Sequence, residues 1–315
     1  MERTTCSTLE CFSDDLLVNL FEYFHTRELL HTFWNLNTRL NQVIQSIDHL
    51  QLTISSTDDF LHLENLFPSI RHLILIGHVN INLEQFVNVH RLVLHSPSSE
   101  LLDQLQNLSL RLEHLSIPDL LFGMSPIFQR IFSNQYSHLQ SCHFFGFETI
   151  ETIGQWTQIF SLRILHIGFI DYHVYKAILS ACPNLYSFKL QIFQSYLTLS
   201  DSIHHANLRI LDIHSEIHDC RYNEQLIDSL LRCVRNVERL TISRTIAMCQ
   251  VRELPADYGW FASIIALRLP MLKYLIVSFR LEYQSEGISS ELRRELRKLF
   301  FQAHPNRYQT RLIIQ

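Results

Sequence analysis

Histidine and cysteine are the side chains that could most readily do chemistry in this chain, which contains 18 His and 7 Cys. Some of them are spaced as metal ligands could be. These clusters are His138, Cys142 and His143, and then His214, His218 and Cys220. Neither cluster is completed by a second Cys/His pair at a spacing typical of zinc sites, and Cys142 and His143 would point to opposite faces of one strand. We therefore expect no metal and no other cofactor.

Motifs for phosphate binding and for nucleophilic or metal-dependent hydrolysis are absent from the sequence. It contains no G-x-x-x-x-G-K-[ST], G-x-G-x-x-G, G-x-S-x-G or H-E-x-x-H, and has only 7 Gly. An enzyme that used scattered His and Asp would need a deep pocket with perturbed titrating groups, and no constellation indicates one. We expect no catalytic residues and no enzymatic activity.

Composition limits the class of protein and of partner. The 315 residues are 47% apolar and 18% charged, with 8 Pro, which excludes a disordered chain with long flexible linkers. The length fits two ordinary domains or one elongated one. The formal net charge of -5 argues against nucleic acid and against a membrane surface as partners, because such binders are normally basic.

The cellular location is indicated by the cysteines and by hydropathy. The odd number of Cys and the absence of C-x-x-C suggest free thiols in a reducing compartment. Met1–Cys6 is followed by an acidic amphipathic stretch, so we expect no secretory signal. The most apolar window, Trp260–Phe279, is interrupted by Arg268, Pro270 and Lys273 and should be buried in a core. We expect a cytoplasmic or nuclear protein.

An internal repeat organises most of the sequence. The pattern apolar-x-x-apolar-x-apolar recurs, and successive starts are 23, 19, 23, 27, 23, 23, 23, 29 and 35 residues apart. Five of these nine intervals are identical, which a chance pattern would not readily produce. The starts are Ile47, Ile70, Val89, Leu112, Leu139, Leu162, Leu185, Leu208, Val237 and Leu272.

Each repeat is predicted to contain one strand and one helix. The last two apolar positions are two residues apart, as on one face of a strand. Helical spacing follows in segments such as Asp171–Cys182 and Asn223–Val237, and a terminal helix, Ser290–Ala303, precedes a closing strand at Leu312–Ile314. Such units bury their apolar faces by stacking, with parallel strands on the concave face and helices on the convex face. An ordinary α/β sheet with crossover helices is the alternative.

The repeats resemble leucine-rich repeats, and Cys182-Pro183-Asn184-Leu185 is similar to the junction in the cysteine-containing subtype. The resemblance covers about residues 47–315 and implies an α/β solenoid over residues 49–315, with a capping helix and strand at its carboxyl end. The Asn that the family carries three positions after each triplet is missing, as at Asp171 and Gln194. We therefore expect an irregular solenoid without a regular side-chain ladder.

Residues between the apolar positions of each strand should line the concave face. They are polar and rich in histidine, which suits the recognition of a polar or mildly acidic surface of an unknown target protein through hydrogen bonds on a rigid scaffold. The candidate target-binding residues are His72, Arg91, His114, His143, His166, Lys189, Asp212, His214, Arg239 and Tyr274.

The first 48 residues have a different, helical periodicity. Ser13, Asp14 or Asp15 can cap a first helix, Thr26 can cap a second over 28–36, and a third is expected over 38–47. Helices this short cannot bury all their apolar side chains alone, so the excess must pack on the repeats or on a partner.

This N-terminal segment resembles an F-box. That family's pattern begins Leu-Pro-x-Glu-Leu-Leu, continues Ile-Leu-x-x-Leu and ends in Val-Ser/Cys-Arg-x-Trp. Here Phe12-Ser13-Asp14-Asp15-Leu16-Leu17 stands for the first part and Leu20-Phe21-Glu22-Tyr23-Phe24 for the second, and Leu36 and Arg39 match the Val and the Arg of the third. Ser13 replaces the Pro, and Leu40 stands near the expected Trp.

The resemblance implies a substrate-recognition subunit of a cullin–RING ubiquitin ligase. The F-box would bind a Skp-type adaptor, and through it a cullin, while the repeats hold the target protein and raise its effective concentration. The resemblance assigns adaptor binding to an apolar ridge, within which Leu29 and Leu36 could equally be core. The candidate adaptor-binding residues are Phe12, Ser13, Leu16, Leu17, Leu20, Phe21, Phe24, Leu29 and Leu36. The alternative is a leucine-rich-repeat interaction scaffold whose N-terminal helices only cap the solenoid.

Overall fold

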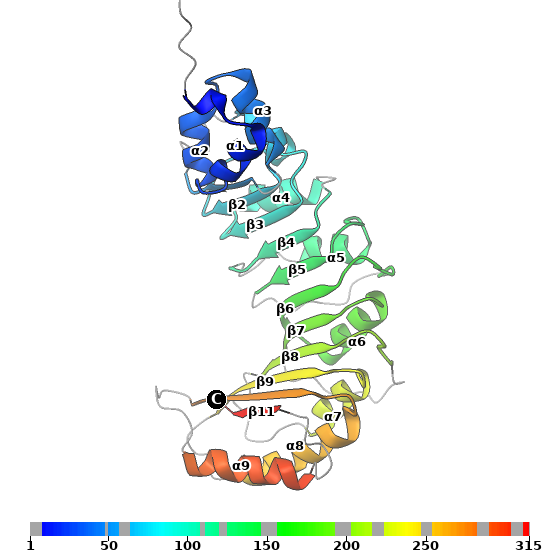
Figure 1. The fold of residues 1–315 in the computed structure, drawn as a ribbon. Coiled ribbons are helices and arrows are strands. Elements are labelled where there is room, and N and C mark those ends of the chain that lie inside the picture. Colours follow the sequence, from blue (N-terminus) through cyan, green and yellow to red (C-terminus); the bar gives the residue numbers. More distant parts are fainter. Residues whose placement is uncertain are drawn as a thin grey trace, which may run out of the picture. The chain divides into compact units, whose positions relative to one another are not determined.

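The protein is an α/β molecule in which parallel strands follow one another in chain order (Figure 1). The computed structural model describes residues 8–47, 50–56, 64–107, 111–119, 125–145, 156–192, 203–215, 224–246, 254–281, 290–303 and 311–314. Its contacts divide the chain into two compact units, Met1–Ile117 and Pro118–Gln315. Residues 48 and 49, where we expected a domain boundary, lie outside the described residues. Within the described part, no helix combines the length and apolarity needed to cross a membrane.

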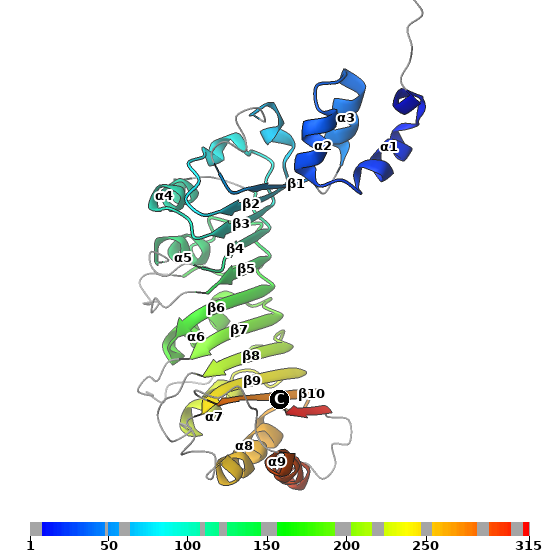
Figure 2. The ribbon, with the colours of Figure 1, turned by 90° about the vertical axis from the view of Figure 1, so that its left-hand side faces the viewer.

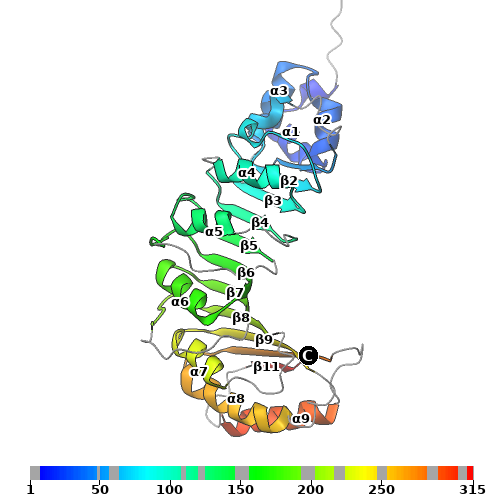
Figure 3. The ribbon, with the colours of Figure 1, turned by 180° about the vertical axis from the view of Figure 1, so that it is seen from behind.

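Among the described residues of the first unit, three helices precede a parallel sheet in chain order. Its helices are α1 (Asp14–Phe21), α2 (Thr26–Phe33), α3 (Thr38–Ser46) and α4 (Ser99–Asn107), with 3-10 turns at Thr8–Cys11, Glu64–Ser69 and Leu83–Gln85. Its strands are β1 (Gln51–Ile54), β2 (His72–Ile76), β3 (Arg91–His95) and β4 (His114–Ile117). The strands pair in order, with Leu52, Leu73, Leu92 and Leu115 side by side. Figures 1 and 3 show α4 on one face of the strands. The opposite strand face, on which Arg91 is exposed, is called the open face.

Local hydrogen bonds set where the N-terminal helices begin. The side chain of Ser13 accepts a bond from the N–H three residues on (3.4 Å), and Asn37 caps α3 in the same way (2.8 Å). We expected Thr26 to cap the second helix, but it is the first helical residue. The cap is one residue earlier because the Glu28 carboxylate accepts a hydrogen bond from the backbone N–H of His25 (3.3 Å).

The same helices form a small core against the first strand. α2 ends at Phe33, before the expected end at Leu36, because Trp34 is extended and Asn35 adopts a left-handed conformation (φ 64°). The Phe33 ring lies 4.9 Å from that of Phe21, which is fully buried. α1 packs on α3, and α2 packs on β1; Figure 2 shows α2 next to β1. The helical segment therefore packs directly on the first strand of its unit.

The second unit repeats the strand–helix pattern. Its strands are β5 (Ser141–Phe144), β6 (Ile164–Ile170), β7 (Ser187–Ile192), β8 (Ile210–Ser215), β9 (Arg239–Ile246), β10 (Tyr274–Leu281) and β11 (Arg311–Ile314). Its helices are α5 (Ser125–Phe132), α6 (Tyr172–Ala181), α7 (Glu224–Arg232), α8 (Leu254–Arg268) and α9 (Ser290–Ala303). β5 to β11 pair in parallel, with Cys142, Leu165, Phe188, Leu211, Leu240, Leu275 and Leu312 in one row. Helices α5 to α7 lie on one side of these strands (Figures 1 and 3).

A backbone arrangement recurs at the start of most strands. Two consecutive N–H groups donate to one carbonyl of the preceding repeat, as Arg209 and Ile210 do to Tyr186 (2.9 and 3.1 Å). Glu238 and Arg239 do the same to Arg209 (2.8 and 3.0 Å). The structure thus confirms the strand positions that the apolar triplets predicted. The parallel repeats are compatible with a solenoid-like α/β fold.

The repeats also have a side-chain ladder, which our sequence analysis did not predict. An asparagine just before the first apolar residue of a triplet donates its Nδ2 to a carbonyl of the preceding repeat. The pairs are Asn88 with Pro68 (2.7 Å), Asn184 with Phe160 (2.9 Å), Asn207 with Pro183 (2.9 Å) and Asn236 with Ala206 (2.8 Å). We expected no regular ladder after the triplets. The four bonds among the described residues form an interrupted ladder, which precedes the triplet instead of following it.

Removing one rung should destabilise the second unit measurably. We expect Asn207→Ala to lower the free energy of unfolding by about 1 kcal/mol, because the Pro183 carbonyl loses its side-chain donor. Chemical denaturation checks this value. Asn80→Ala is the matched control, since Asn80 is exposed and makes no hydrogen bond among the described residues. Equal stability of the two variants would contradict a structural role for the ladder.

Candidate interaction surfaces

The open face of the first unit carries a row of basic and imidazole side chains. His72, Arg91 and His114 are register partners at the starts of β2, β3 and β4. Their alternation with buried leucines places them on the face opposite the core. Partial burial lowers the pKa of His72 to about 4, with Arg91 and His114 adding to the effect, and burial likewise lowers the pKa of His114. The row brings together three of the predicted target-binding residues.

The open face of the second unit carries the other predicted residues in register rows. His143, His166, Lys189 and Asp212 lie side by side on β5 to β8. The rings of His143 and His166 stack with centroids 4.1 Å apart, and Ser141 Oγ lies 3.0 Å from His143 Nε2. A neighbouring row contains Arg239 and Tyr274, and His214 lies in a third, next to Gln191 on β7 and Ser243 on β9. The structure therefore places all these residues on one strand face of their unit.

His166 should make stability depend on pH. Burial lowers its pKa to about 4, helped by His143 and Lys189 and opposed by Asp212. The unfolded chain, with the usual histidine pKa near 6.5, therefore binds the proton more readily, and the free energy of unfolding falls as pH drops from about 6.5 towards 4. Over this range the free energy of unfolding of His166→Gln should fall by about 1 kcal/mol less than that of the wild type. The difference is no larger because His166 is partly exposed, which weakens the effect. Denaturation at pH 7 and pH 4.5 tests this; parallel losses in both proteins would contradict it.

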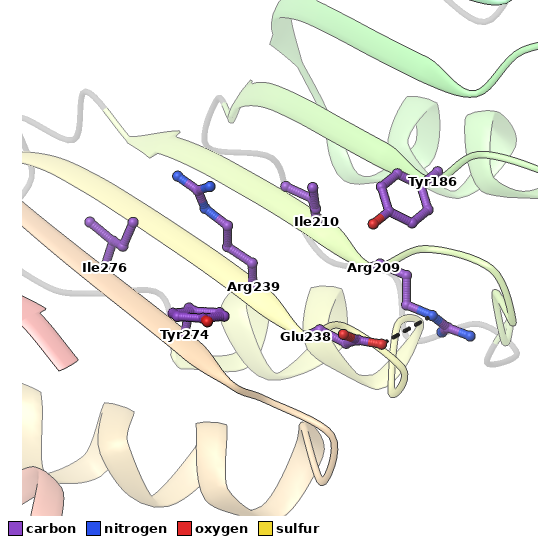
Figure 4. Close-up of a pocket in the computed structure, with 7 residues that line it drawn as sticks. All are labelled: Tyr186, Arg209, Ile210, Glu238, Arg239, Tyr274 and Ile276. Carbon is purple, nitrogen blue, oxygen red and sulfur yellow. Dashed lines mark ion pairs between the residues drawn. The ribbon is translucent and has the colours of Figure 1, made fainter. Parts of the chain in front are cut away.

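A cleft of about 320 Å³ opens on the strand face of the second unit, at the amino ends of β7 to β10. Figure 4 shows its lining: Tyr186, Arg209, Ile210, Glu238, Arg239, Tyr274 and Ile276. Arg239 and Tyr274 were among the residues expected to contact a target. Sequence reasoning missed Tyr186, Arg209 and Glu238, which directly precede strand residues on the open face. The signal was available, since Tyr186, Arg209 and Glu238 occupy the same position in successive repeats.

Ion pairs hold one wall of this cleft. The Glu238 carboxylate lies 3.6 Å from Arg209 Nε and 2.6 Å from Lys273 Nζ. The hydrogen bond from Lys273 is the main cause that keeps the pKa of Glu238 below its usual value, and the charges of Lys273 and Arg209 add to it. Arg209 also donates from Nη1 to the carbonyls of Ala206 (3.0 Å) and Asn236 (3.2 Å). This network fixes the Arg209 guanidinium.

The helical segment carries the second candidate surface, and its predicted residues divide by burial. Leu17, Phe21 and Leu29 are buried and form the segment's core, whereas Leu20 and Phe24 are half-buried. Ser13 is exposed and caps α1. The residues with large exposed apolar side chains are Phe12 (44%), Leu16 (56%) and Leu36 (62%), together with Tyr23, which was not singled out.

Arg39 links the segments from which these exposed side chains come. From α3 it donates through Nε to Asp14 Oδ1 (2.9 Å), at the start of α1, and through Nη2 to the carbonyl of Phe12 (2.5 Å). Leu36 directly precedes Asn37, the cap of α3. The hydrogen bonds of Arg39 therefore connect the start of α1 to α3, and exposed apolar residues lie at the starts of both helices. Arg39 itself lies near the surface.

A metal centre is not seen among the described residues, where no group of three or more His, Cys, Asp or Glu side chains could hold an ion. His218 and Cys220 of the second histidine–cysteine cluster lie outside those residues. No protein-family model matches the chain, and no curated protein is similar to it in sequence.

Proposed function

We propose that the chain is the substrate-recognition subunit of a cullin–RING ubiquitin ligase. The N-terminal helices bind a Skp-type adaptor, and through it a cullin, and the open face of the strands holds a target protein. The single observation that carries the proposal is the exposure of Phe12, Leu16 and Leu36 on a helical segment whose core is already filled by buried residues such as Leu17 and Phe21. Soluble surfaces that expose several large apolar side chains together are commonly interaction sites.

The arrangement of these residues supports adaptor binding over simple capping. A cap needs an apolar face only towards the repeats, and here α2 supplies the contact with β1. Phe12 and Leu16, at and before the start of α1, are not needed for that contact, because Leu17 and Phe21 already fill the core. A few such side chains, buried by a partner, can supply most of the binding free energy of an interface.

The strand face supports the second half of the proposal. It presents half-exposed polar side chains from adjacent strands, such as His166, Lys189 and Asp212, on a rigid hydrogen-bonded sheet. A surface of this kind suits a protein partner with complementary hydrogen-bonding groups. A receptor built this way acts by holding adaptor and target together, and itself needs no catalytic residue.

A second candidate function is a protein-interaction scaffold whose helices only cap the repeats. The packing of α2 on β1 favours it, since a capping helix makes this contact. The two functions differ in whether the adaptor binds.

Co-expression of the tagged full chain with a Skp-type adaptor tests the proposal. We expect the two proteins to co-purify in equal amounts through affinity and size-exclusion steps. Failure of a well-folded chain to retain the adaptor would overturn the proposal and leave the scaffold. The whole chain should be used, because removal of the helices exposes the part of β1 that α2 covers.

A further inference from the structure

The cleft at the amino ends of β7 to β10 combines apolar walls with basic side chains. Ile210 and Ile276 lie half-buried in its floor, and the rings of Tyr186 and Tyr274 are about half exposed beside them (Figure 4). The register places Arg239 between Ile210 and Tyr274. A ligand in this cleft meets apolar surface, phenolic hydroxyls and a guanidinium group.

The cleft is locally basic in a chain whose formal net charge is -5. Three cationic side chains, Arg209, Arg239 and Lys273, lie at or next to the cleft, together with the carboxylate of Glu238. Arg209 and Lys273 are both engaged by that carboxylate. The side chain of Arg239 is exposed, and its guanidinium makes no ion pair or hydrogen bond with any described residue. One guanidinium is thus available to an incoming anion.

The chemistry of the available group identifies the ligand. A guanidinium binds a carboxylate through two parallel N–H···O bonds, and such charged hydrogen bonds are stronger than neutral ones. A doubly charged phosphate is normally held by several cations, and here the neighbouring cations already have a partner. Isoleucine and tyrosine side chains on either side would contact an apolar residue next to the acidic one.

We propose that this cleft binds an acidic side chain, Asp or Glu, flanked by an apolar residue, from an extended segment of the target protein. Arg239 pairs with the carboxylate, Tyr186 and Tyr274 border it, and Ile210 and Ile276 contact the apolar neighbour. The assignment of the segment to a ubiquitination target rests on the proposed function; the recognition of acidic peptide does not.

A peptide library tests the assignment. The immobilised full chain is exposed to a positional-scanning library of octapeptides with acetylated amino ends and amidated carboxyl ends, which leaves side-chain carboxylates as the anions. We expect Asp or Glu to be selected at one position, next to an apolar residue. Arg239→Gln removes the charge and keeps a polar side chain with hydrogen-bond donors, and it should weaken binding of the selected peptide about tenfold.

Matched variants and peptides sharpen the result. Arg235→Gln is the control, because Arg235 is also exposed and lies outside the cleft; it should bind as the wild type does. Changing the peptide's Glu to Gln should weaken binding by a factor similar to that of Arg239→Gln. No selection of acidic residues, or equal binding by Arg239→Gln, would overturn the proposal. Tighter binding of a phosphoserine peptide, or of a free carboxyl terminus, would also overturn it.

Adaptor co-purification, measured on the same proteins, separates this inference from the proposed function. Adaptor binding without acidic selection would refute the cleft assignment alone. Acidic selection without adaptor binding would support the cleft assignment and refute the ligase.

Discussion

Leu16→Asp should abolish adaptor binding without unfolding the protein, whereas Leu17→Asp should unfold the helical segment. Leu16 is 56% exposed and Leu17 is 0% exposed, although they are adjacent in α1. A charge at Leu16 stays in water in the free protein but would be buried by the adaptor, which should weaken binding by about a hundredfold or more. At Leu17 the unpaired charge is buried in the folded chain itself and should cost about 4 kcal/mol or more.

Two measurements on each variant test this contrast. Amide hydrogen exchange in α1 to α3 reports unfolding of the helical segment, and co-purification reports adaptor binding. Phe301→Asp on α9 is the matched control, since Phe301 is a similarly exposed apolar residue outside the helical segment; it should retain both properties. A folded Leu16→Asp variant that binds the adaptor normally would contradict the interface.

Tyr175→Ala should be among the most destabilising substitutions in the second unit. Tyr175 on α6 is fully buried, its ring lies parallel to that of Phe188 on β7 (centroids 5.7 Å apart), and its hydroxyl donates to the carbonyl of Leu230 on α7 (3.2 Å). It therefore connects two helices and a strand. Loss of the ring leaves a cavity, and we expect the free energy of unfolding to fall by about 4 kcal/mol.

Tyr175→Phe separates the hydroxyl from the ring. It keeps the packing on Phe188 and leaves the Leu230 carbonyl without this donor, so it should cost only about 1 kcal/mol. Chemical denaturation of both variants gives the two values. Similar losses for both would contradict the view that ring packing is the main contribution of Tyr175.

Strand positions could be predicted because strand burial follows from local sequence. Alternation of apolar and polar residues, repeated at nearly constant intervals, identified the rows that contain Leu165, Phe188 and Leu211. The helix at Ser290–Ala303 also matched. By contrast, α8 (Leu254–Arg268) was not predicted; its apolar residues are not confined to one face, and only the part from Trp260 was noted, as a buried window.

The sites were harder to predict because they depend on contacts between elements. Nothing in the local sequence distinguishes Leu16 from Leu17; the difference arises when α1 packs on α3. Predicting the cleft would have required the ion pairs of Glu238 with Arg209 and Lys273, and these partners lie far apart in the sequence. Two sets of residues had a usable local signal, because each set recurs at one position of successive repeats. They are the cleft residues Tyr186, Arg209 and Glu238, and the ladder of asparagines, which lies at a position other than the one expected from the leucine-rich-repeat resemblance.

The most direct test of the central claim is the mass of the complex formed when the purified full chain, a Skp-type adaptor and a cullin are mixed. Analytical ultracentrifugation should show one species containing one copy of each, and Leu16→Asp should remain a separate, folded species. If the wild-type chain sediments alone beside an adaptor–cullin complex, the chain is not a ligase subunit.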